Sequence, residues 1–154
     1  MKRSIVLIAF LLAGCSRPQV PAGLIAEPGT YPSPSGQWVL DVSRGEKTIV
    51  QYAITNIQSG VAFRPEHDFS EVQRWAFFWE SDSRLWCHSS DIGTSLWILD
   101  ENAVWAQHWL TSDSKYGKEI PDTLFRFLPS SARRMGADTN DTGDSSKPAG
   151  GNDQ

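Results

Sequence analysis

Short runs of β-branched, aromatic and aliphatic residues recur through the middle of the chain, and polar residues typical of turns separate them. The runs lie at residues 38–42, 48–54, 75–79, 85–88, 95–99 and 103–110. Between the first two, the sequence Arg44-Gly45-Glu46-Lys47 predicts a hairpin turn. The regular spacing of the other runs predicts that the whole set forms an antiparallel meander.

One segment near the C-terminus has helical signals. Pro121 suits the first turn of a helix, and Leu124, Phe125 and Leu128 would form an apolar face over residues 121–128. The segment is short enough that a strand is also possible. The predicted fold class is therefore mainly β: a small antiparallel meander sheet with one short C-terminal helix.

Two parts of this meander are alike. Residues 35–43 and 82–90 match turn for turn and strand for strand at an offset of 47 residues, and a second strand follows each. With residues 34–38 and 89–100, these two hairpin units resemble blades of β-propeller repeats, although a closed ring takes about four to eight blades. Three interpretations are open: the units pair in one twisted sheet, several chains complete a ring, or aromatic hairpins simply look alike.

The N-terminus has a different pattern. Lys2 and Arg3 precede an apolar run at residues 5–12, and small residues follow it. A retained transmembrane helix needs roughly 20 apolar residues, which is far more than this run provides. Residues 1–14 are therefore predicted to be a signal peptide.

The last residues of this segment, Leu12-Ala13-Gly14-Cys15, resemble the lipobox of bacterial lipoproteins. The resemblance implies that Cys15 is acylated, with palmitate among the expected chains, and becomes the first mature residue and the membrane anchor. The alternative is an ordinary cysteine after a Sec-type leader. In Gram-negative relatives an Asp after the cysteine tends to retain the protein in the inner membrane. Ser16 stands there, which favours a cell-envelope location at the outer membrane, facing the periplasm.

Composition divides the rest of the chain. Five of the nine prolines lie between residues 16 and 36. Residues 15–30 are accordingly predicted to be an extended, lipidated tether that holds the domain tens of ångströms from the bilayer. Residues 31–135 are predicted to form one β-rich domain. Residues 136–154 carry no large apolar side chain and are predicted to be a disordered polar tail.

Charge and cysteine content narrow the possible partners. Removal of Lys2 and Arg3 with the signal peptide leaves 12 basic and 18 acidic side chains, a net charge of −6, so nucleic acid is a poor partner. With Cys15 lipidated, Cys87 has no cysteine to pair with, and it is predicted to be a buried structural residue.

Seven tryptophans are the main compositional excess. Strand alternation places several of them in rows, such as Trp75-Phe77-Trp79 and Trp105-Gln107-Trp109. Such rows form either a packed core, the favoured interpretation, or an open platform on which sugar rings could stack. For the open platform, the candidate ligand-contact residues are Trp38, Trp86 and Trp97.

Catalytic and metal-binding signals are sparse. The available ligand types are His67, Asp68, Cys87, His88, Asp91 and His108, and no two of them have His-x-x-x-His or Cys-x-x-Cys spacing. No cofactor, metal or enzymatic activity is predicted. A hydrolase built on His88, Asp91 and His108 remains an alternative, and it requires these side chains to lie within hydrogen-bonding reach of one another.

These observations predict a membrane-anchored lipoprotein with a small non-catalytic β domain. Its role would be protein binding or envelope structure, through strand edges or through Trp38, Trp86 and Trp97. The alternative is a glycan-binding module that recognises peptidoglycan or oligosaccharide through a tryptophan-rich sheet face.

Overall fold

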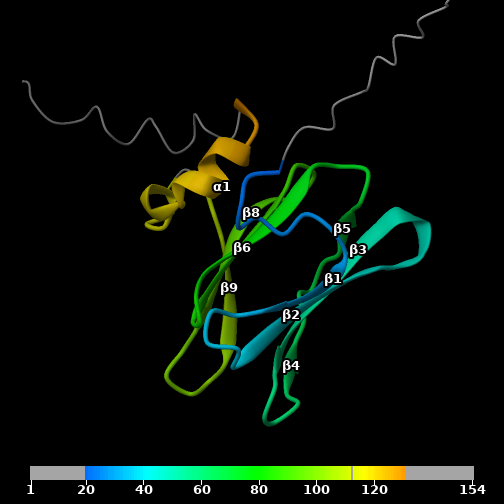
Figure 1. The fold of residues 1–154 in the computed structure, drawn as a ribbon. Coiled ribbons are helices and arrows are strands. Elements are labelled where there is room, and N and C mark those ends of the chain that lie inside the picture. The colour runs from blue at the N-terminus through cyan, green and yellow to red at the C-terminus, as the bar shows by residue number, and fades with distance from the viewer. Residues whose placement is uncertain (1–19, 112, 131–154) are drawn as a thin grey trace, which may run out of the picture.

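The chain folds into two antiparallel sheets and one short helix in the computed structural model, which describes residues 20–111 and 113–130 (Figure 1). The predicted signal peptide, Cys15 and the polar tail of residues 136–154 lie outside the described residues. The mainly β fold class, with an antiparallel meander and a C-terminal helix, is confirmed.

The first sheet contains the N-terminal strands in the order β1-β2-β3-β4, with β5 also paired to β3. Its strands are β1 (Gly29–Pro32), β2 (Trp38–Arg44), β3 (Ile49–Asn56), β4 (Ala62–Phe63) and β5 (Phe69–Ser70). The predicted hairpin forms between β2 and β3, with Leu40 opposite Ile54. Its turn includes the short 3-10 segment η1 (Glu46–Thr48), where Lys47 adopts a left-handed backbone conformation with φ of 58°.

The second sheet is a meander in the order β6-β7-β8-β9. Its strands are β6 (Trp75–Ser81), β7 (Arg84–Ser89), β8 (Gly93–Leu99) and β9 (Trp105–Trp109). A second 3-10 segment, η2 (Gly117–Glu119), leads into the helix α1 (Asp122–Phe127). The strand alternative for residues 121–128 is thus wrong, and the helix begins directly after Pro121.

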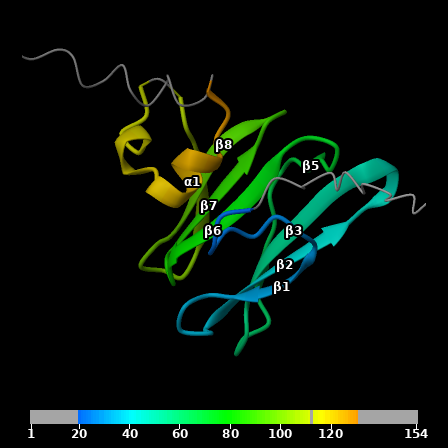
Figure 2. The ribbon, with the colours of Figure 1, turned by 45° about the horizontal axis from the view of Figure 1, so that its top comes forward.

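The elements stack in three layers, with the second sheet in the middle (Figure 2). One core lies between the sheets and includes Leu40 and Ile54 from the first sheet with Phe77 and Leu85 from the second. The other core lies between the second sheet and α1. It includes Trp86, Leu96, Leu124, Phe127 and Leu128. The middle sheet therefore buries both faces, which explains why consecutive side chains of β7 and β8 are buried.

The two similar hairpin units lie in different sheets, so their pairing in one twisted sheet is wrong. Each unit has an apolar face, and the two faces exclude water by packing against each other. The turns that precede the two units are also in contact. The backbone N–H of Ser35 donates to Oδ1 of Asp82, its counterpart 47 positions later, at 2.8 Å.

The described part of the predicted tether is packed onto the domain. Gly29–Pro32 forms the edge strand β1 on β2, and Ile25 exchanges backbone hydrogen bonds with Phe77 of β6 at 2.8 and 2.9 Å. The prediction of an extended, unpacked chain is therefore wrong for these residues. Proline lacks an N–H but is tolerated at a sheet edge, which is where Pro32 lies.

Candidate functional site

The three tryptophans proposed from the sequence as ligand contacts are buried. Trp38 is 2% exposed, Trp86 is 0% exposed and Trp97 is 4% exposed. Trp38 and Trp97 lie between the sheets, whereas Trp86 lies under the helix on the opposite face of the second sheet. They form no common platform and serve as core residues, because rings without accessible surface cannot stack on a ligand.

The strand β9 presents an open sheet edge. Among the strands that the structure describes, its one partner is β8, where the backbone N–H of Leu110 donates to the carbonyl oxygen of Thr94 at 2.9 Å. Bonded pairs alternate in an antiparallel ladder, so the backbone groups of Trp105, Gln107 and Trp109 point away from β8. Within residues 20–111 and 113–130, no backbone hydrogen bond reaches these outward groups.

The other edges of the two sheets are protected. β1 ends in Pro32, β4 and β5 have two residues each, and β6 is covered by its bridge to Ile25. Charged residues, proline or a covering segment are the usual protection of edge strands. The sequence of β9, Trp-Ala-Gln-His-Trp, contains no charged residue and no proline. This edge is therefore free to pair with another strand.

A cleft of about 410 Å³ opens beside β9, between the edges of the two sheets. Aromatic and polar side chains line it: Phe63, Arg64, Glu66, Trp97, Trp105, Gln107 and Trp109. Trp97 and Trp105 are almost completely buried and form the floor, while Trp109 is 39% exposed at the rim. The accessible lining is therefore shared by the ring of Trp109 and by the polar groups of Arg64, Glu66 and Gln107.

The floor of the cleft is held by contacts with both sheets. The indole N–H of Trp97 donates to the hydroxyl of Tyr52 on β3 at 2.9 Å. The ring of Trp105 packs edge-on against that of Trp38, with 5.5 Å between ring centroids. The side-chain amide of Gln107 donates to the Ser95 hydroxyl on β8 at 2.9 Å. These contacts fix the floor before any ligand arrives, which lowers the entropy cost of binding.

Part of this site was visible in the sequence. Strand alternation predicts the row Trp105-Gln107-Trp109, whereas Trp97, proposed as a ligand contact, lies almost completely buried beneath the cleft. Phe63, Arg64 and Glu66 were missed, because β4 has only two residues and gives no strand signal. Their approach to β9 depends on the packing of the two sheets, which no local pattern reports.

The side chains of the hydrolase hypothesis have separate partners. The Nδ1 atom of His88 lies 2.9 Å from the Thr94 hydroxyl, and Asp91 accepts a hydrogen bond from the backbone N–H of Ser70 at 2.9 Å. The ring of His108 packs against that of Tyr116. No hydrogen bond between these three residues is found, so the arrangement that the hypothesis requires is not formed.

Burial shifts the pKa values of two side chains of β7, Cys87 and His88. Desolvation raises the pKa of the Cys87 thiol to about 12. It also lowers the pKa of His88 to about 4, and the positive charge of Arg74 acts in the same direction. The predicted burial of Cys87 is confirmed, and both groups are neutral at pH 7.

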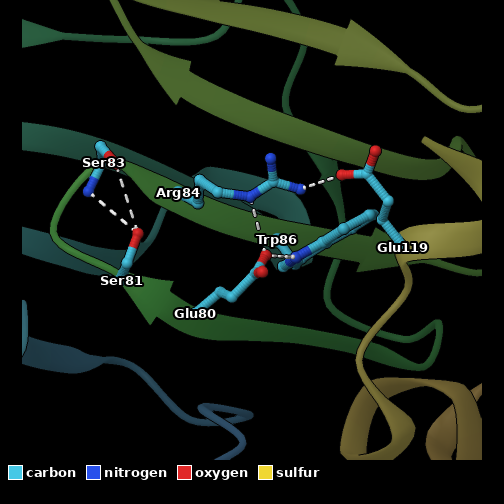
Figure 3. A network of polar contacts seen from close by, with 6 residues as sticks. All are labelled: Glu80, Ser81, Ser83, Arg84, Trp86 and Glu119. Carbon is cyan, nitrogen blue, oxygen red and sulfur yellow. Dashed lines mark hydrogen bonds and ion pairs between the residues drawn. The ribbon is translucent and has the colours of Figure 1, made fainter. Parts of the chain in front are cut away.

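A polar network ties the C-terminal segment to the second sheet (Figure 3). The guanidinium of Arg84 donates to Glu80 at 2.9 Å and to Glu119 at 2.6 Å. The same Glu80 oxygen accepts the indole N–H of Trp86 at 2.6 Å. Because these groups satisfy one another, we assign the network a structural role.

Comparisons with protein-family models, curated proteins and solved structures find no match. In the described part of the chain, no His, Cys, Asp and Glu side chains gather in a group of three or more that could hold a metal ion. The helices of that part are too short or too polar to cross a bilayer.

Proposed function

We propose that this chain is a lipid-anchored protein of a bacterial cell envelope, and that its β-sandwich binds an extended protein segment along β9. The free, uncharged edge of β9 beside a preformed aromatic cleft is the observation that carries the binding role. The anchoring role is supported by the charged, apolar and lipobox-like order of residues 1–15.

The proposed binding mode is strand addition. A partner segment would hydrogen-bond to the outward backbone groups of Trp105, Gln107 and Trp109 and so become a fifth strand of the second sheet. Its side chains would alternate, and those on the inner side would enter the cleft. Backbone pairing supplies affinity in this mode, and the pockets for alternate side chains supply specificity.

The lining of the cleft indicates which side chains would fit. The exposed ring of Trp109 suits an apolar or aromatic group, while Arg64 and Glu66 offer one charge of each sign at the cleft. We therefore expect the preferred segment to be extended, with an apolar residue flanked by polar ones.

Selection from a displayed library of random short peptides on the acylated full-length protein tests this proposal. Selected peptides should bind the Gln107→Pro variant more weakly, because proline removes an outward N–H donor. One lost hydrogen bond of about 1 kcal/mol corresponds to about fivefold in affinity. Trp109→Ala should weaken the same peptides by about tenfold or more through lost aromatic contact.

The matched control is Val104→Ala, an exposed position in the turn just before β9. Its affinity for each peptide should equal that of the wild type. Peptides that bind all variants equally, or the recovery of none above background, would exclude strand addition at β9.

Glycan binding is a second candidate function, favoured by the exposed ring of Trp109 beside planar polar side chains. Sugar faces stack on such rings, and amide or charged groups bond to sugar hydroxyls. Titration with muropeptides should then change the tryptophan fluorescence of the wild type and leave that of Trp109→Ala nearly constant. Unchanged emission of the wild type at millimolar ligand rules this candidate out.

A further inference from the structure

The distance from the proposed anchor to the folded domain is short. Residue 20 is the first described residue, and the chain joins the domain soon after it: Leu24 contacts the helix-side core and Ile25 pairs with β6. Five residue steps separate Cys15 from Val20, which span at most about 18 Å when fully extended. The packed segment leaves no room for a long spacer.

We infer that the end of the sandwich around Val20 and Val72 lies directly against the lipid bilayer. This inference rests on the proposed lipidation of Cys15. The predicted tether would have placed the domain tens of ångströms away, and the packing of residues 24–30 removes seven of its sixteen residues.

The composition of this end suits contact with lipid. Val72 is 76% exposed and Val20 is 46% exposed, and the two line one surface depression together with Arg74 and Phe127. The Arg74 guanidinium lies 4.1 Å from the centre of the Phe127 ring. Exposed apolar side chains next to arginine are typical of membrane-interface surfaces, where the charge stays near the headgroups.

Apolar exposure alone does not select this end. Val61 and Val104, which are also exposed, lie in the turns at the opposite end of the sheets. Val72 follows β5, whose Ser70 N–H donates to Asp91 in the β7–β8 turn, whereas Val104 lies in the β8–β9 turn. The length of chain available from Cys15 is what favours the Val20 end.

In this orientation β9 runs from the end far from the membrane, at Trp105, toward the membrane-facing end, at Trp109. β4, whose Phe63 lines the cleft, lies at the far end of the sandwich from both ends of the described chain (Figure 1). A protein segment could then reach the Trp105 end of β9 without displacing lipid.

Site-specific fluorescence on the acylated full-length protein tests the inference. Val72→Cys and its matched control Val104→Cys are each labelled with an environment-sensitive fluorophore. Cys87 should stay unlabelled because it is buried. The proteins are reconstituted into phosphatidylethanolamine and phosphatidylglycerol vesicles that contain a nitroxide-labelled lipid. Quenching at position 72 should exceed quenching at position 104 several-fold, and equal weak quenching at both positions would overturn the inference.

A second variant tests the role of chain length. A flexible insert of about 20 residues between Gln19 and Val20 adds a typical end-to-end distance of about 25 Å. Quenching at position 72 should then fall toward the value at position 104, and undiminished quenching would overturn the inference. Mass spectrometry of the same samples separates the two proposals. Absence of acyl chains on Cys15 overturns both, whereas acylated protein with an unquenched position 72 overturns the orientation alone.

Discussion

Burial makes Cys87 and His88, which are neighbours on β7, unreactive, although cysteine and histidine are often reactive in proteins. Cys87 lies between the two sheets, and His88 lies on the helix side, where its ring meets that of Phe127. Adjacent strand residues point to opposite faces, so the two cannot act as a pair. Their unusual pKa values follow from desolvation.

The buried His88 should make stability depend on pH. Its pKa is lowered to about 4 in the folded protein, whereas an unfolded histidine titrates near 6.5. The unfolded state therefore binds more protons between these values, so stability is fully present above about pH 6.5 and falls as the pH drops toward 4. Urea unfolding at pH 7 and pH 5 should show a loss that is smaller in His88→Asn, and an equal loss in both proteins would contradict this explanation.

The thiol of Cys87 should be unreactive in the native state. Thiolate is the reactive form, and burial both raises the thiol pKa to about 12 and blocks access. The expected result with a colour-forming disulfide reagent is negligible reaction at pH 8 until urea unfolds the protein. Rapid reaction of the folded protein would show that β7 is more accessible than the structure indicates.

At the scale of elements, the two edges of β9 differ in their hydrogen bonds. The backbone N–H and C=O groups of its even-numbered residues bond to β8, and those of its odd-numbered residues point away from β8. Ala106→Pro should therefore remove a ladder hydrogen bond and destabilise the fold by at least about 2 kcal/mol. Gln107→Pro should cost clearly less. Comparison of the two free energies of unfolding by urea denaturation checks the register, and equal losses would show that β9 is oriented differently.

The network around Arg84 allows a second contrast between elements. Glu80→Ala leaves the buried Trp86 indole without its acceptor, which costs about 1–3 kcal/mol. Glu119→Ala removes only a half-exposed ion pair, worth less than about 1 kcal/mol. Urea denaturation of both variants should rank Glu80→Ala as the less stable. The reverse order would contradict the role given to Glu80.

The strands with β-branched and aromatic runs and the helix after Pro121 could be predicted from the sequence, because their patterns are local. β1 could not, since Pro32 and its neighbours also suit a linker. The division into two sheets depends on which apolar faces bury each other over long sequence separations. The position of Phe63 beside β9 in the cleft also depends on this long-range packing of the two sheets.

For the whole molecule, three layers produce a domain with distinct ends and sides. One open side of the sandwich is closed by residues 25–32, and the other holds the cleft beside β9. The packed N-terminal segment shortens the connection to Cys15, so the proposed anchor and the proposed binding edge would lie on different sides of the domain. The anchoring role depends on the proposed acylation, whereas the binding role rests on the free edge of β9.

Intact mass spectrometry of the protein extracted from bacterial membranes after expression with its N-terminal segment tests the central claim most directly. The account predicts a chain that begins at Cys15 and carries acyl chains, and a Cys15→Ala variant that lacks both the cleavage and the lipid. A wild-type chain without acyl mass, or a Cys15→Ala variant processed and retained in the membrane like the wild type, would contradict it.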